Sequence, residues 1–197
     1  MLPVRASVGR SAPLILCGMD LARSYTRITH TDLRRLARLA QEDREDFFSR
    51  HPEFALLYRK RLLAVALGED AALHYLNGAT GVRDFSVWSF YAEHPEAPFP
   101  FHRVGRVDFG KSKFGRSPDA PETYAGRRVE LHARSIDAAP TDDPVDALQR
   151  YLKAAASPSA RELAQKAVVL IGPESYVGAE AWPTLALPAS TPPAHER

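Results

Sequence analysis

Three residues of this chain have the types and the spacing that a divalent cation site needs. Asp84 follows a turn region and immediately precedes an apolar segment, and Ser86 comes two residues later. Because the side chains of a strand alternate between its two faces, Asp84 and Ser86 are expected on one face. Glu130 lies in the centre of another apolar segment, where a carboxylate is costly unless it is exposed, paired or metal-bound. If the two segments pair as strands, Asp84 and Glu130 can share a magnesium ion whose remaining ligands are nucleotide phosphates.

The same residues also fit a purely structural role, which the sequence leaves open. Asp84 would then cap a turn and Ser86 would fill a small buried space. Glu130 would pair with a nearby arginine, for which there are three candidates: Arg83, Arg127 and Arg128.

The elements that must position these residues follow from the apolar pattern and from the prolines and glycines. An amphipathic pattern predicts a helix that Thr31 and Asp32 open and that His51-Pro52 ends. The other expected elements are, in order, a helix over 53–60, a strand over 62–67, a helix over 71–76, strands over 85–91 and 128–136, a helix capped by Thr141 and broken by Pro158, a helix capped by Ser159 that runs to Lys166, and a strand over 167–171.

This order of elements predicts one α/β (α+β) domain, in which a small mixed sheet is flanked by helices. We expect a flexible leader over residues 1–30, the domain over 31–183, and a disordered tail rich in proline and alanine over 184–197. No apolar run approaches the ~20 residues of a membrane helix. The only cysteine, Cys17, excludes an intrachain disulfide and favours a cytoplasmic protein, and the formal net charge of +2 gives no global field for nucleic acid or membrane.

Residues 94–126 are expected to form a long loop with a short strand near 101–107. Gly105 to Ser112 match the phosphate-loop pattern G-x-x-x-x-G-K-[ST], which suggests a phosphate-loop NTPase as one function. That chemistry needs a helix directly after the motif, and the glycine and prolines that follow do not favour one. From Phe101 to Arg128 there are seven Lys and Arg against three acids, so Lys111, Lys113 and Arg116 are candidates to bind phosphates or an RNA backbone. A solvated basic loop is the alternative.

The segment from 62 to 136 resembles the nucleotidyltransferase superfamily, the polymerase-β-like fold. In that family an apolar strand ends in Gly-Gly or Gly-Ser, a helix follows, the next strand carries Asp-x-Asp, and a later strand carries a third carboxylate. Residues 62–67 with Gly68 resemble the first strand and its glycine, and 71–76 resemble the helix. Asp84-Phe85-Ser86 resembles the Asp-x-Asp strand, and Glu130 resembles the third carboxylate. The resemblance implies that Asp84 and Glu130 hold magnesium, that Ser86 stands at a catalytic position, and that Gly68 and the basic loop bind a nucleotide.

Two departures from the family pattern bear on activity. Ser86 stands where the family has its second metal-binding aspartate, and a serine supplies no charge. Glu69 and Asp70 follow Gly68 where the family has a small residue, and two carboxylates there repel a triphosphate. The expected function is therefore a nucleotidyltransferase-like protein that is weakly active or inactive, with an RNA or a protein as its acceptor. The alternative is a non-enzymatic binding or interaction module on the same scaffold.

Overall fold

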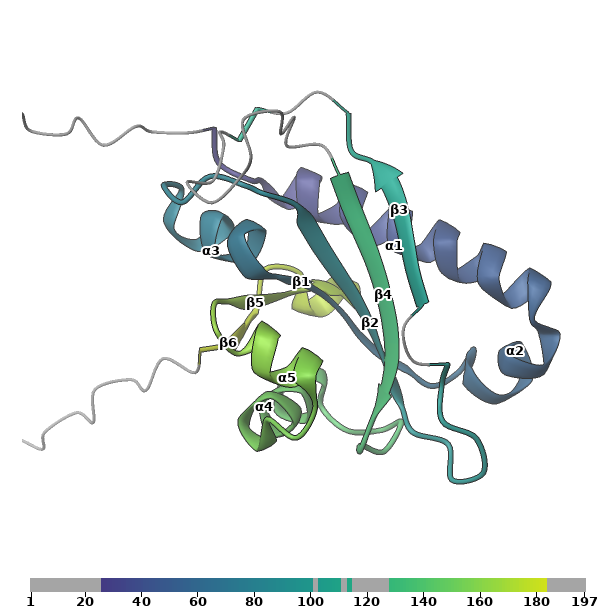
Figure 1. Cartoon of the computed structure of the whole chain (residues 1–197). Helices are drawn as coiled ribbons and strands as arrows, with labels where there is room; N and C mark the ends of the chain where they lie inside the picture. The colour runs from purple at the N-terminus through teal and green to yellow at the C-terminus, as the bar shows by residue number, and fades with distance from the viewer. Residues whose placement is uncertain (1–25, 101–102, 111–112, 115–127, 184–197) are drawn as a thin grey trace, which may run out of the picture.

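The computed structural model describes residues 26–100, 103–110, 113–114 and 128–183 (Figure 1). The predicted fold class is confirmed, since these residues form a mixed α/β domain. Its elements are α1 (His30–Arg50), α2 (Pro52–Tyr58), β1 (Leu62–Gly68), α3 (Glu69–Asn77), β2 (Phe85–Ala92), β3 (Arg103–Asp108), β4 (Arg128–Ile136), α4 (Pro144–Ala154), α5 (Pro158–Leu163), β5 (Val168–Gly172), the 3-10 turn η1 (Glu174–Tyr176) and β6 (Glu180–Trp182).

The six strands form one sheet in the order β3-β4-β2-β1-β5-β6. The neighbours β2 and β4 run parallel, whereas every other neighbouring pair is antiparallel. The chain leaves β2, forms the edge strand β3, and returns through β4 into the place beside β2. Two strands far apart in the sequence, β2 and β4, therefore lie side by side along their full length.

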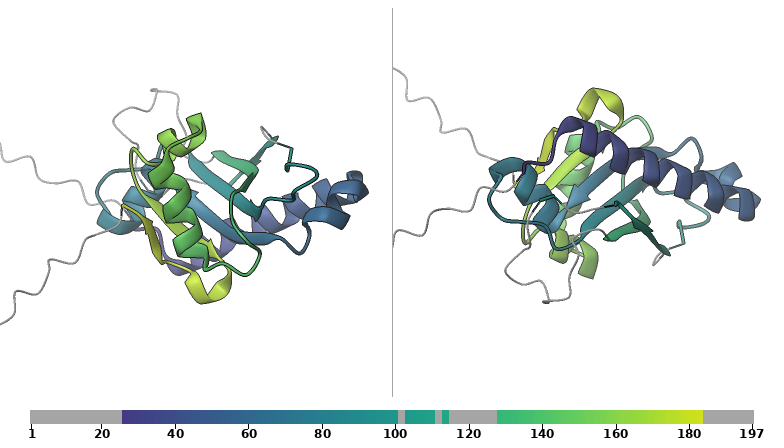
Figure 2. Two further views of the ribbon diagram at one scale, coloured as in Figure 1. Left: turned by 90° about the horizontal axis from the view of Figure 1, so that it is seen from below. Right: turned by 90° about the horizontal axis from the view of Figure 1, so that it is seen from above.

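Helices cover both faces of the sheet, with α1 on one face and α4 and α5 on the other (Figure 2). Alternate residues of β2 enter the two layers: Phe85 and Val87 pack in the core under α1, whereas Trp88 and Phe90 pack under α4 and α5. This two-sided cover explains why β1 and β2 are almost continuously apolar. A third, aromatic cluster joins the end of α1 to α2 and the far end of the sheet.

The predicted elements are present, and their ends differ where capping differs. Thr29 caps α1 in a reciprocal capping box with Asp32, so the helix begins before the expected Thr31. Asp143 rather than Thr141 caps α4, because its carboxylate accepts from two backbone N–H groups. Ser157 rather than Ser159 caps α5, and Pro158 begins this helix instead of breaking the chain before it.

Three further differences concern short segments. α3 begins directly after Gly68, two residues before the expected start. β6 was not predicted, because three residues carry too little pattern to reveal a strand. Residues 26–30, assigned from the sequence to the leader, belong to the packed domain, since Ile28 is buried in the core under α1. The rest of the expected leader and the expected tail over 184–197 lie outside the described residues.

Candidate functional site

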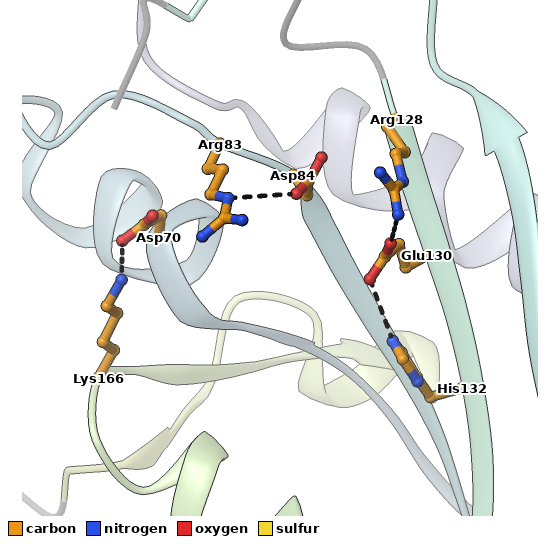
Figure 3. A network of polar contacts seen from close by, with 7 residues as sticks. All are labelled: Asp70, Arg83, Asp84, Arg128, Glu130, His132 and Lys166. Carbon is orange, nitrogen blue, oxygen red and sulfur yellow. Dashed lines mark hydrogen bonds and ion pairs between the residues drawn. The ribbon is translucent and has the colours of Figure 1, made fainter. Parts of the chain in front are cut away.

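The parallel pairing of β2 and β4 brings the sequence-predicted carboxylates together. Ser86 is the register partner of Glu130, and Trp88 is the partner of His132. Alternation along β2 puts Asp84, Ser86 and Trp88 on the face that α4 and α5 cover. Asp84 and Glu130 thus lie on one face of adjacent strands, close to where both strands begin (Figure 3).

The side chain of Asp84 is partly buried, with 21% of its surface exposed. Burial raises the pKa of Asp84 above its usual value, and the nearby carboxylate of Glu130 raises it further, while the Arg128 guanidinium lowers it. Arg83 Nε lies 3.7 Å from Asp84 Oδ2, at the long end of ion-pair distances. Asp84 and Glu130 therefore interact electrostatically, and a cation between them would relieve their repulsion.

Glu130 has two basic neighbours on its own strand (Figure 3). Arg128 donates to one carboxylate oxygen, and His132 Nε2 lies 3.8 Å from the other. His132 stacks on Trp88 with their ring centroids 4.3 Å apart, and burial lowers the pKa of His132, which favours its neutral form at neutral pH. Arg128 is therefore the main charge partner of Glu130, as the structural alternative expects for one of the three arginines.

Ser86 is buried, with 3% of its surface exposed. Its hydroxyl accepts a hydrogen bond from Trp88 Nε1 at 2.9 Å and also contacts the carboxyl group of Glu69. Burial raises the pKa of Glu69, and the contact with Ser86 partly offsets this rise. The Ser86 hydroxyl is thus held by two neighbouring side chains.

Glu69 is the residue of this site whose position the sequence did not reveal. It was expected only as a charge that repels phosphate, whereas its side chain returns to the Ser86 hydroxyl on β2. Glu69 also has a φ of 60°, a backbone conformation that glycine adopts readily and other residues adopt at a cost of about 1–2 kcal/mol. The only sequence signal for this corner was Gly68-Glu69 directly after an apolar strand.

Gly68 lies at the end of β1, beside Ser86 on β2 and Val168 on β5. A Cβ atom at this position would come within 2.6 Å of Leu163 Cδ2 on α5. The glycine is therefore needed for the close packing of α5 on the sheet. The volume next to Gly68 that the resemblance gives to a phosphate holds the Leu163 side chain.

Asp70, in the first turn of α3, is buried and pairs with Lys166, which precedes β5 (Figure 3). This ion pair joins α3 to the segment before β5, which lies about a hundred residues later in the sequence. Lys166 also lowers the pKa of Glu69, so one ammonium group balances part of the negative charge at this corner.

The predicted basic loop is only partly described. Lys113 Nζ lies 3.1 Å from Asp32 Oδ1, and the neighbouring Phe114 packs against Phe85 in the core under α1. Lys113 therefore lies on the α1 side of the sheet, and the structure does not bring it together with Asp84 and Glu130. Lys111 and Arg116 lie outside the described residues.

The phosphate-loop motif begins in a regular strand. Gly105 to Asp108 are paired with β4 as part of β3, so their backbone groups belong to a sheet rather than to a loop that wraps phosphate. Gly110 has a positive φ of 93° and ends the strand region, and Lys113 and Phe114 are not helical. This geometry argues against a phosphate-loop NTPase.

Asp84 and Glu130 provide two hard oxygen donors, which suits a magnesium ion that takes its other ligands from phosphates and water. Among residues 26–100, 103–110, 113–114 and 128–183, no group of three or more His, Cys, Asp and Glu residues could hold a metal ion. None of the described helices is long and apolar enough to cross a membrane. No family model, curated protein or solved structure matches this chain.

Proposed function

We propose that this chain is a nucleotidyltransferase-like protein that binds one magnesium ion and a nucleoside triphosphate at Asp84 and Glu130. Transfer of the nucleotide to an RNA or protein acceptor is slow or absent, because Ser86 supplies no second carboxylate to β2. The observation that carries the proposal is the parallel pairing of β2 and β4, which puts both carboxylates on one face of adjacent strands.

Two further observations support the proposal. The pKa of Asp84 is raised by burial and by Glu130, which is the electrostatic situation that a bound cation relieves. Glu69 has a positive φ directly after Gly68, at the place where the resembling family has Gly-Gly or Gly-Ser. Bound magnesium would neutralise phosphate charge and orient the triphosphate. Asp84 and Glu130 would hold it, at the expense of the pairing of Glu130 with Arg128.

A non-enzymatic binding module on this scaffold is the second candidate, and two contacts favour it. The Ser86 hydroxyl accepts from Trp88, and Leu163 fills the volume beside Gly68. The first contact occupies the Ser86 hydroxyl, and the second fills space beside the Gly68 backbone, so neither group is open to a substrate in a transfer reaction. This candidate shares the fold with the first and differs in whether turnover occurs.

Calorimetric titration with Mg-ATP and Mg-CTP tests the proposal. We expect saturable binding to the wild-type protein that EDTA abolishes and that Asp84→Asn and Glu130→Gln each weaken at least tenfold, since each removes one charged metal ligand. Asp142→Asn is the matched control, because Asp142 also pairs with an arginine, Arg150, at a distance from this site.

The outcomes separate the candidates. No magnesium-dependent binding, or equal weakening by Asp142→Asn, would show that the proposal is wrong. Binding without transfer of labelled nucleotide to RNA or protein would support the binding module. Transfer that depends on Asp84 would establish an enzyme.

A further inference from the structure

A pocket of about 390 Å³ lies between α1 and the sheet, on the face opposite Asp84 and Glu130. Its floor is apolar and is formed by residues of β1 and β5, among them Leu62, Val65 and Ile171. Its wall is formed by α1 and is strongly basic, with Arg34, Arg38 and Arg44. A volume of this size is in the range of small-molecule sites, ~300–1,000 Å³.

The basic wall follows from the helical repeat. Arg34, Arg38 and Gln41 are spaced by four and three residues, so they lie along one stripe of α1, and Arg44 follows one turn later at the border of that stripe nearer the sheet. This stripe borders the apolar stripe that packs on the sheet. Arg44 can therefore lay its methylene groups on the sheet, whereas the exposed Arg34 and Arg38 line the pocket from its solvent side.

The three arginines differ in how their charge is balanced. Arg34 pairs with Glu174, with 2.8 Å between Nη2 and Oε1, and both side chains are mostly exposed. Among the described residues, no carboxylate lies within ion-pair distance of Arg38 or Arg44. Two guanidinium groups of the pocket are thus left without a carboxylate partner there.

Arg44 is the most informative of these residues because it is partly buried, whereas Arg34 and Arg38 are exposed. Its Nη1 donates to the hydroxyl of Ser89, a buried residue of β2, at 3.3 Å. Burial lowers the pKa of Arg44, although a guanidinium group stays protonated. Asp43 and Glu45 on α1 act against this lowering at longer range without an ion-pair contact to Arg44, and Glu45 pairs with Arg59 at 2.8 Å. A partly buried cation whose described hydrogen bond goes to a neutral hydroxyl is stabilised when an anion completes its surroundings.

We propose that this pocket binds a phosphorylated small molecule, whose phosphate lies between Arg38 and Arg44 and whose apolar or ring portion lies on the floor formed by Leu62, Val65 and Ile171. A phosphate monoester carries a charge of about −1.5 to −2 at neutral pH, which matches two guanidinium groups without a carboxylate partner among the described residues better than a single carboxylate does. Guanidinium groups bind phosphate oxygens in a bidentate way, and the pocket is far larger than a phosphate alone needs. The inference is independent of the proposed function, since the two sites are on opposite faces of the sheet.

The test uses phenyl phosphate and inorganic phosphate as probes, titrated into the full chain with EDTA present so that no metal-dependent site contributes. We expect phenyl phosphate to bind more tightly than inorganic phosphate, because its ring contacts the apolar floor. Arg38→Gln is expected to weaken binding roughly tenfold, as removal of one charge-assisted pair does. Arg38 is exposed, so this variant is expected to fold normally. Arg44→Gln is expected to weaken binding at least as much.

Arg50→Gln is the matched control, because Arg50 lies on the same helix, pairs with Asp46 and does not line the pocket. Binding that is weakened by Arg38→Gln, kept in Arg50→Gln and kept in Asp84→Asn supports the inference. Absence of saturable phenyl phosphate binding at millimolar concentration would overturn it, as would equal loss in all three arginine positions tested. A short RNA that binds these arginines while phenyl phosphate fails to compete would also overturn it in favour of a nucleic-acid surface.

Discussion

The two faces of the sheet differ in how completely their charged side chains are paired, although both contain ion pairs such as Arg34–Glu174 on the α1 face. Around the candidate site, three acids have a cation close by: Arg128 for Glu130, Arg83 for Asp84, and Lys166 for Asp70. On the face under α1, Arg38 and Arg44 have no such carboxylate partner among the described residues. Charges that are balanced within the chain contribute to the fold, whereas unbalanced ones beside a pocket indicate where a ligand binds.

The two faces also differ in how tightly they are filled. Leu163 of α5 contacts the backbone of β1 at Gly68 so closely that a Cβ atom there would be 2.6 Å away. At Gly172, beside the α1 pocket, an added Cβ atom would meet Val65 at an ordinary 3.5 Å. Substitution of Gly68 and of Gly172 by alanine therefore compares how tightly the two faces are packed.

The largest expected effect is that of Gly68→Ala. The new methyl group forces Leu163 or α5 to move, which lowers the free energy of unfolding by about 2 kcal/mol, as overpacking does in well-packed cores. Gly172→Ala is the control and is expected to change it by less than about 0.5 kcal/mol. Urea denaturation of both variants checks this. Should Gly68→Ala match the wild type, the α5 face has open space beside Gly68, and the argument that Leu163 excludes a phosphate fails.

The second prediction concerns Glu69, where a strained backbone conformation and a partly buried carboxyl group occur in one residue. Glu69→Gly is expected to raise the free energy of unfolding by about 1 kcal/mol at neutral pH, because glycine adopts a positive φ without strain. Ala155→Gly is the matched control, since Ala155 also has a positive φ, 48°, and has no carboxyl group.

The pH dependence separates the carboxyl contribution from the backbone contribution. Since the folded-state pKa of Glu69 lies above 4.5, its usual value, the folded state binds this proton more tightly than the unfolded state does. The burial penalty is therefore absent below about pH 4.5, grows as the pH rises through the folded pKa, and is constant above it. The advantage of Glu69→Gly should be smaller at pH 4 than at pH 7, whereas that of Ala155→Gly should not change. Equal gains at both pH values would show that Glu69 is not buried as described.

Several features of the two faces can be predicted from the local sequence pattern. The other features depend on contacts between residues far apart in the sequence. Alternation along 85–91 correctly predicts that Asp84 and Ser86 share a face, because that depends only on strand geometry. Whether Glu130 joins them depends on β4 lying parallel to β2, which the sequence alone left open because β3 separates them along the chain. The proximity of Leu163 to Gly68 likewise involves residues nearly a hundred positions apart.

The arginine pocket was missed for a different reason. The amphipathic pattern of α1 assigns every arginine to the polar side of the helix, and Arg38 conforms to it. Arg44 lies at the border between the two stripes, and only the packing of α1 across β2 carries its guanidinium group to the buried Ser89. A helical repeat gives the direction of a side chain, whereas its burial depends on the surface that the helix meets.

The smallest expected effect is that of Glu174→Gln, and it measures how far the balance of charge in the pocket can be shifted. The Arg34–Glu174 pair is exposed, so its loss is expected to change the free energy of unfolding by less than about 0.5 kcal/mol. Removal of one negative charge from the pocket wall should nevertheless tighten phenyl phosphate binding about two- to threefold at low salt. The gain should disappear in high salt, where charges at this separation are screened.

Glu53→Gln is the control for this change, because Glu53 is an exposed acid on α2 that does not line the pocket. Its affinity for phenyl phosphate should equal that of the wild type. If Glu174→Gln weakens binding instead, the Arg34–Glu174 pair holds the pocket in its binding shape, and Glu174 does not compete with the phosphate for the arginines. If both variants tighten binding equally, the attraction depends on the net charge of the protein, and phenyl phosphate does not bind specifically in the α1 pocket.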